Sequence, residues 1–380
     1  MIFINYQESK LPINTPNLAN FLLLSLLFLL CLLFLRRRKE DPQHFLDRKQ
    51  TEQLKGAAIL FIVAGHLWAH VATTRPSLMF SDDAVAVFLL LSGYGLTISI
   101  RTKILRGKDF FWRRLNRVMV PYWLASVFIL LLDYIFLGRT YQLYDLMMTS
   151  LGINLNSTTR HIDYVRWFVT YIIVWYVIFF AVIPKLLPPN NLFMLFCVAA
   201  VMFFADYYVF DFGKHFVMFP LGCCLGTYRD YLSHFIRKHQ KYVALTAFLC
   251  GFFVISSEFL LAAASLRQYI YTMMPNILMA AYTEFTSIIF SMGLICGVRW
   301  LTLQKYESVF LLLCGRYSYE IFLIHGALLI KYNPVIRDER LLSLIVGFIL
   351  FVMLLLLLAS GLEKISNFCL TRGPLTKKTV

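Results

Sequence analysis

The sequence predicts an all-α integral membrane protein with about eleven transmembrane helices, one at the N-terminus and ten forming a core bundle. Of its 380 residues, 59% are hydrophobic and only 15% are charged. Apolar runs of about 20 residues, the length that crosses a bilayer, recur along the chain. The intervals between these runs leave no room for a separate soluble domain. Any active site must therefore be built inside the helix bundle.

The first apolar run extends from Leu18 to Leu35 and ends in the basic segment RRRKE. A signal peptide has the reverse order, with its basic residues before the apolar part. We therefore expect a membrane span with the N-terminus outside and residues 36–39 in the cytoplasm. A polar cytoplasmic linker follows at 40–53, with a short amphipathic helix expected at the membrane surface. The predicted units are an anchor with its linker (1–53), a membrane domain (54–362) and a basic cytoplasmic tail (363–380).

Ten further spans are expected after the linker. Their approximate limits are 55–72, 84–100, 118–137, 166–183, 191–209, 215–228, 241–259, 276–298, 307–330 and 341–360. The span at 215–228 is short, which leaves open a re-entrant or broken helix. The protein is expected in the inner (plasma) membrane of the cell. Spans that cross it alternately place the C-terminus in the cytoplasm.

The net charge of +15 has two explanations, nucleic-acid binding and membrane topology. Threading favours topology, because Lys and Arg gather in the intervals assigned to the cytoplasm, whereas the intervals assigned to the outside carry acidic residues such as Asp82, Asp83, Asp338 and Glu339. No nucleic-acid partner is therefore expected. The eight cysteines include no Cys-x-x-Cys pair and lie mostly within apolar runs, so neither a disulfide framework nor a metal site is predicted.

Lys55 and His66 share one face of the first core helix. Eleven residues at about 100° each complete three turns to within about 20°, and at about 1.5 Å per residue they span about 16 Å. That distance is about half the hydrocarbon thickness. Lys55 is therefore expected at the cytoplasmic boundary and His66 near the bilayer midplane, with His70 one turn beyond. A histidine at that depth is either a general base or a packing residue bonded between helices.

Arg114 and Arg117 are spaced i, i+3 just before the span at 118–137, so they share a helix face. Guanidinium groups bind phosphates through paired hydrogen bonds. The alternative is that both arginines only anchor the helix at the cytoplasmic boundary.

Two further stretches place polar or small residues within spans. In AVFLLLSGYGLTISI, Ser92 and Tyr94 lie beside Gly93 and Gly95, which favours either close helix packing or a widened spot that admits a substrate. In CGRYSYEIFLIHGALL, the polar residues are Ser318, Glu320 and His325. Glu320 and His325 are five residues apart on different helix faces, so they are not expected to pair. We take Ser92, Tyr94, Ser318 and His325 as candidate substrate-binding residues.

Together these stretches resemble the membrane acyltransferase-3 family, which acylates bacterial cell-surface glycans. The family has a basic residue ten residues before a histidine in its first core helix, which Lys55 and His66 match. Its cytoplasmic RxxR before a proline-bearing helix is matched by Arg114 to Arg117 and Pro121. A Phe…SG motif corresponds to Phe88 and Ser92-Gly93, and an SY…IFLIH motif to residues 318–325. The family's Trp-Ser-Leu…Glu motif is matched only at Trp167, with no acid following.

The resemblance implies about ten core helices and transfer of an acetyl group from cytoplasmic acetyl-CoA to a hydroxyl on an extracytoplasmic glycan or lipid-linked glycan. It implies a catalytic His66, acting as base or as acylated intermediate, with Lys55, Arg114 and Arg117 binding the donor. Acetyl or succinyl donors and the oligomeric state stay open. Two other classes also stay open: a transporter of a sugar, lipid or amino acid, and a non-catalytic scaffold or sensor.

Overall fold

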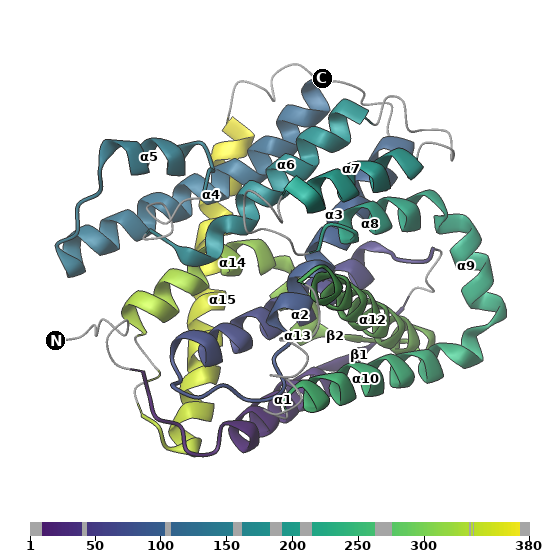
Figure 1. The fold of residues 1–380 in the computed structure, drawn as a ribbon, viewed down its shortest axis with the longest axis horizontal. Coiled ribbons are helices and arrows are strands. Elements are labelled where there is room, and N and C mark those ends of the chain that lie inside the picture. The colour runs from purple at the N-terminus through teal and green to yellow at the C-terminus, as the bar shows by residue number, and fades with distance from the viewer. Residues whose placement is uncertain are drawn as a thin grey trace.

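The computed structural model describes residues 10–39, 44–102, 108–154, 162–182, 192–205, 215–262, 276–333, 336 and 338–372. Almost every element in these ranges is a helix (Figure 1). The elements of the first half are α1 (Pro16–Leu33), β1 (Leu35–Arg37), α2 (Arg48–His70), α3 (Ser81–Thr102), α4 (Lys108–Leu137), α5 (Leu143–Ser150), η2 (Tyr164–Arg166) and α6 (Trp167–Val182). Those of the second half are α7 (Leu192–Ala205), α8 (Met218–Thr227), α9 (Arg229–Lys238), α10 (Gln240–Ala262), α12 (Asn276–Leu303), β2 (Tyr306–Ser308), α13 (Val309–Arg316), α14 (Ser318–Ala327), η6 (Leu328–Tyr332) and α15 (Leu341–Arg372).

Six of the described helices are long and apolar enough to cross a membrane: α1, α3, α4, α10, α12 and α15. Helices α6, α7 and α8 are apolar but shorter. This content agrees with an all-α membrane protein, and the total of eleven spans stays a prediction. Helix α8 has only ten residues, about 15 Å, or half of the hydrocarbon thickness. It is followed by a break at Tyr228, after which α9 begins, so the span expected at 215–228 is short but is not interrupted within α8.

The helices differ from the expected segments in three places. The linker at 40–53 has no separate surface helix in its described part, because Asp47 caps α2 in a capping box with Gln50 and the helix begins at Arg48. The span at 307–330 is not continuous, since it breaks at Tyr317 between α13 and α14 and ends in a π-helical turn, η6. Helix α15 continues to Arg372, so residues 363–372 are helical, and residues 373–380 of the expected tail lie outside the described residues.

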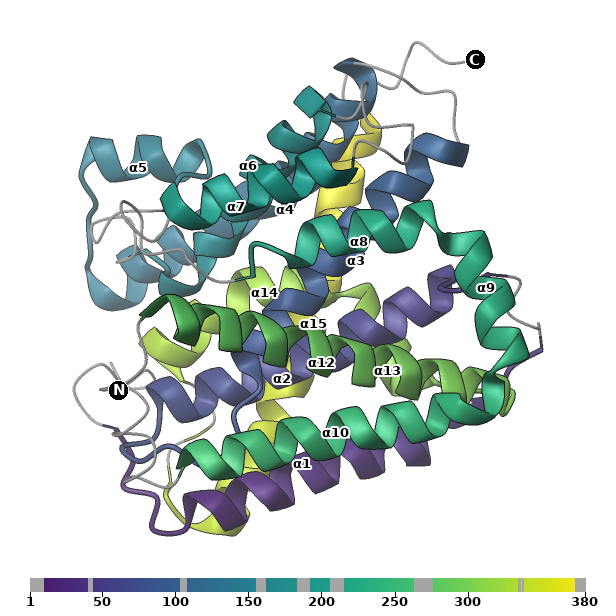
Figure 2. The same ribbon diagram turned by 45° about the vertical axis from the view of Figure 1, so that its right-hand side comes forward.

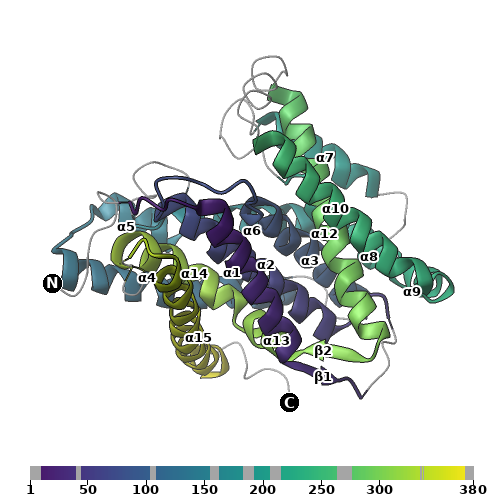
Figure 3. The ribbon, with the colours of Figure 1, turned by 90° about the horizontal axis from the view of Figure 1, so that it is seen from below.

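The segments at one end of the bundle are tied to each other by a small sheet. Strands β1 and β2 pair antiparallel, with Arg36 opposite Glu307, and an Arg36 Nε–Glu307 Oε1 ion pair of 2.8 Å joins them. Gln53 of α2 accepts a hydrogen bond from the Ser308 backbone N–H. Figure 3 shows this sheet beside the ends of α1 and α13. Alternate threading of the spans places residues 36–39 and 299–308 on the same side of the membrane, and these contacts agree with that prediction.

The segments at the opposite end of α2 are also tied together. The Leu11 backbone N–H donates to the Val71 carbonyl at 2.8 Å, and the Trp68 indole donates to Asn20 at 2.8 Å. Asn20 in turn donates to the Leu78 carbonyl in the α2–α3 connection. The N-terminal helix α1 is therefore bound to the membrane domain at both of its ends.

Helices α2 and α13 touch backbone to backbone. A Cβ added at Gly56 would lie 2.0 Å from the Leu311 carbonyl oxygen, and one added at Gly315 would lie 1.7 Å from the Glu52 carbonyl oxygen. Only glycine allows this approach, as at many membrane helix contacts. Helices α3 and α8 meet in the same way, because a Cβ at Gly93 would lie 2.2 Å from the Phe219 carbonyl oxygen. Gly93 therefore serves helix packing, one of the two roles left open for it.

The remaining long helices complete the bundle around α2. Helices α10 and α12 run side by side, and α12 also contacts α2 and α3 (Figure 2). Helix α14 lies against α2, α4 and α15. Helix α2 is thus enclosed by α3, α12, α13 and α14, and most of its side chains between Leu54 and Trp68 are buried.

We predict that Gly56→Ala destabilises the protein, because the added methyl group overlaps the α13 backbone. Overpacking of this kind costs about 1–3 kcal/mol. The measurement is thermal unfolding of the purified protein in detergent. Gly361→Ala in α15 is the matched control, since a Cβ there meets no atom within 4 Å. A Gly56→Ala protein that melts with the Gly361→Ala protein would contradict the packing role.

Candidate active site

Two histidines from different helices meet near the centre of the bundle. His66 Nδ1 of α2 lies 2.8 Å from His325 Nε2 of α14. The ring planes are within 3° of parallel and the ring centroids are 5.0 Å apart. With the nitrogens at 2.8 Å, this separation means that the rings meet edge to edge in one plane. His325 is fully buried and His66 half-buried, so His66 is the more accessible member of the pair.

The backbone around His325 decides which ring nitrogens carry protons. His325 Nδ1 lies 2.9 Å from the Phe322 carbonyl oxygen and 3.1 Å from the Ile321 carbonyl oxygen. Carbonyl oxygens only accept hydrogen bonds, so Nδ1 is the protonated nitrogen and Nε2 of a neutral His325 is an acceptor. His66 must then donate its Nδ1–H to His325. The neutral His66 is left with its lone pair on Nε2, the nitrogen that faces away from His325.

A buried ion pair lies behind His325. Arg166 Nε is 3.0 Å from Asp163 Oδ2, and both side chains are almost fully buried. The same guanidinium donates to the Leu323 carbonyl of α14 at 3.0 Å and to Ser126 Oγ of α4 at 2.6 Å. Asp163 is close enough to His325 to interact with it electrostatically. The pair therefore holds η2, α4 and α14 together at the level of the histidines and places a negative charge near His325.

The basic residues at the start of α2 and α4 also come together. Lys55, half-buried on α2, lies within electrostatic range of Arg114 on α4 and of Glu320 on α14. Arg114 is half-buried, Arg117 is exposed, and the two interact electrostatically. Glu320 and His325 are thus engaged with different residues, as expected from their spacing. The donor-binding residues predicted from the sequence are therefore linked by electrostatic interactions, with Lys55 eleven residues before His66 on α2 and the two arginines on α4.

Ser92 belongs to the same region. Its hydroxyl lies near the Tyr176 side chain of α6, and Tyr176 lies within electrostatic range of Arg114. Arg114 donates to Ser99 Oγ at 2.8 Å, and Ser99 lies two turns beyond Ser92 on α3. Ser92 and Ser99 are seven residues apart, which places both on one side of α3. Tyr176 was missed in the sequence because an aromatic residue in an apolar span has no distinguishing pattern.

Tyr94 is engaged elsewhere. It lies two residues after Ser92, about 200° around α3, and its hydroxyl donates to the Leu46 carbonyl at 2.8 Å. The Phe45 ring packs edge-on against it. The structure therefore places Tyr94 against the segment that precedes α2, and does not bring it together with His66.

Ser318 and His70 have weaker links to the histidine pair. Ser318 is buried at the first position of α14 and lies seven residues from His325, on the same face two turns away. The His70 ring is 5.5 Å from the His66 ring, centroid to centroid, in an edge-on arrangement. His70 is therefore a neighbour of His66, on the side away from Lys55.

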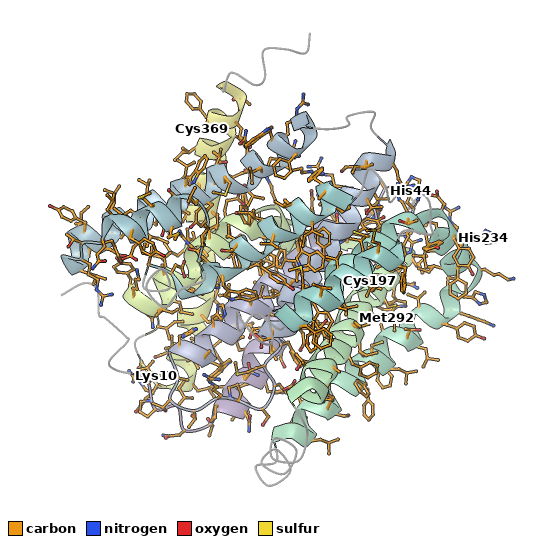
Figure 4. The ribbon with its side chains drawn as sticks, turned by 45° about the horizontal axis from the view of Figure 1, so that its top comes forward. Lys10, His44, Cys197, His234, Met292 and Cys369 are labelled. Atoms are coloured by element: carbon orange, nitrogen blue, oxygen red, sulfur yellow. The ribbon has the colours of Figure 1, made fainter. Side chains whose placement is uncertain are left out.

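No group of three or more His, Cys, Asp or Glu side chains that could hold a metal ion occurs in the part of the chain that the structure describes. The cysteines in that part are all unpaired. Figure 4 shows two of them, Cys197 on α7 and Cys369 on α15, well apart from each other. The site is thus composed of two histidines, a buried ion pair and a basic cluster.

Residues 48–362 match the family model described as an acyltransferase domain, which corresponds to the acyltransferase-3 family. No curated protein and no solved structure matches the chain. The matched range begins at the first turn of α2 and ends within α15, so it includes both histidines and the whole basic cluster. Because the match covers most of the chain, the protein belongs to the acyltransferase-3 family of membrane acyltransferases.

Proposed function

We propose that the protein is an O-acyltransferase that moves an acetyl group from cytoplasmic acetyl-CoA to a hydroxyl of an extracytoplasmic glycan or lipid-linked glycan. The family supports acyl transfer in a membrane. The observation that carries the finer proposal is the His66–His325 hydrogen bond of 2.8 Å. It leaves one basic nitrogen, His66 Nε2, half a bilayer away from a cluster of cations suited to phosphates.

Lys55, Arg114 and Arg117 bind the phosphates of the donor in this proposal. Coenzyme A carries several phosphate charges, which keep its nucleotide end at the membrane boundary. Guanidinium groups hold such phosphates through paired, charge-assisted hydrogen bonds. The pantetheine arm then extends along the α2 face that joins Lys55 to His66 and brings the thioester near the histidine pair.

His66 Nε2 removes the proton of the acceptor hydroxyl as its oxygen attacks the thioester carbonyl carbon. The carbon–sulfur bond breaks, and the departing thiolate takes the proton back from Nε2. The Nδ1–H of His66 stays bonded to His325 throughout, which stabilises the transient imidazolium. The alternative route, in which Nε2 itself takes the acyl group before the hydroxyl does, uses the same nitrogen.

The proposal is tested with acetyl-labelled acetyl-CoA supplied to the cytoplasmic side of membranes that contain the protein. We expect base-labile label in the glycan fraction and an equal amount of free coenzyme A. A transporter would leave the thioester intact, and a scaffold or sensor would show no dependence on His66. Either result would contradict the proposed function.

We predict that His66→Ala lowers acetyl transfer by about 10²–10⁴-fold, the usual contribution of a general base. The protein should still insert and should melt near the temperature of the wild type. The matched control is His234→Ala, which removes an exposed histidine on α9, at the edge of the molecule in Figure 4. Transfer by His66→Ala at the wild-type rate would exclude His66 as the base.

His325 is a positioning residue, and its substitutions should separate its role from packing. His325→Gln keeps an acceptor oxygen for His66 Nδ1–H, whereas His325→Phe removes it at similar size. We expect His325→Phe to lower kcat with little change in KM, and His325→Gln to recover part of kcat. Equal kcat values in the two variants, at equal thermal stability, would show that the hydrogen bond does not matter.

Arg114→Gln should weaken acetyl-CoA binding. Hydrogen bonds to a charged group contribute about 1.5–3 kcal/mol, or roughly 10–150-fold in Kd. Calorimetric titration of the purified protein measures the change, which should shrink as salt concentration rises. Arg113→Gln is the control, because Arg113 is an exposed neighbour on another face of α4. Equal Kd values for the two variants would place the donor elsewhere.

A further inference from the structure

A small apolar cavity lies between α2, α3, α6 and α14. Its volume is about 20 Å³, enough for one group the size of a water molecule or a methyl. All of the atoms exposed in it are apolar. The lining residues are Ile62, Val85, Phe88, Phe168, Tyr319 and Phe322.

The cavity lies where a donor thioester would arrive. Ile62 is one turn before His66 on α2, and seven residues after Lys55, so all three residues share one face of the helix. On the other wall, the Phe322 ring lies 5.8 Å from the His325 ring, centroid to centroid. The cavity is therefore next to the histidine pair, on the side of the basic cluster.

The walls of the cavity are closely packed. The Phe168 ring packs edge-on against Phe88 at 6.4 Å and against Phe322 at 5.3 Å between centroids. The hydroxyl of Tyr319 donates to the Val118 carbonyl at 2.9 Å, which fixes that ring. Closely packed side chains of this kind do not shift cheaply to admit a larger group.

We propose that this cavity is the acyl-group pocket, which accepts the methyl of an acetyl donor and excludes longer or charged acyl groups. The inference rests on the proposed function. A propionyl or butyryl chain needs more volume than the cavity has. A succinyl group would bury its carboxylate against apolar atoms with no hydrogen-bond partner, which is strongly unfavourable. The sequence leaves acetyl and succinyl donors open, and the cavity favours the acetyl donor.

The test compares acetyl-, propionyl-, butyryl- and succinyl-CoA as donors, following release of the coenzyme A thiol by the intact membrane protein. For the wild type we expect propionyl-CoA to have a kcat/KM about tenfold or more below that of acetyl-CoA, the usual discrimination for one methylene. Succinyl-CoA should be inactive. Val85→Ala enlarges the cavity and should bring the propionyl and acetyl values close together, while succinyl-CoA stays inactive.

Val87→Ala is the matched control, since Val87 is a buried valine on α3 that does not line the cavity. A second enlarging variant, Ile62→Val, guards against misfolding of Val85→Ala and should shift the ratio in the same direction. If both variants transfer acetyl with the wild-type ratio of donors, the pocket is elsewhere and the proposed function stands. If the wild type releases no thiol from any donor, the proposed function itself fails.

Discussion

The arrangement of the site depends on the backbone contact between Gly56 of α2 and Gly315 of α13. These glycines are 259 residues apart, and so are His66 and His325. Helix α2 and the α13–α14 pair therefore run in the same direction and in register, with the glycine contact ten residues before the histidine contact. The break at Tyr317 does not disturb this register. A side chain at either glycine would separate the helices and, with them, the two rings.

Buried ion pairs hold α14 from its other side. Arg166 links Asp163 to α4 and α14, and Lys331 of η6 lies 2.6 Å from Asp133 of α4. Each charge is paired and further hydrogen-bonded, as burial in an apolar bundle requires. These pairs fix the rotation of α14 about its own axis, and this rotation directs His325 toward α2. Both rings of the histidine pair are thus held, one by α2 and its glycine contact and the other by α4 and η2.

Side chains of different chemistry follow one another along the site, from the basic residues of α2 and α4 to the histidines. Cations collect where α2 and α4 begin, apolar side chains line the middle, and the histidines follow. In the proposed function, a charged nucleotide would meet the cations and a short acyl group would meet the apolar side chains. The basic nitrogen of His66 would lie next to that acyl group. In the proposed reaction, the donor and the acceptor would meet at His66, and no moving domain would be needed to carry the acyl group.

Much of this could be predicted from single residues and their spacing. The apolar runs located the long helices, and helix geometry alone related Lys55 to His66. The basic residues near Arg114 were recognisable because charge at the end of an apolar run is conspicuous. Boundaries were less certain, since the polar start of α2 resembles a linker until the Asp47 capping box is seen.

The sequence by itself determined that the chain is a helical membrane protein and that a histidine shares a helix face with a lysine eleven residues before it. Only the tertiary structure decided that His325 is the partner of His66, that Tyr176 lies near both Ser92 and Arg114, and that Tyr94 faces another segment. The physical reason is that helix periodicity relates residues within one helix only. Which faces of two distant helices meet depends on close contacts such as Gly56 with Gly315, and no local pattern specifies the partner of a glycine.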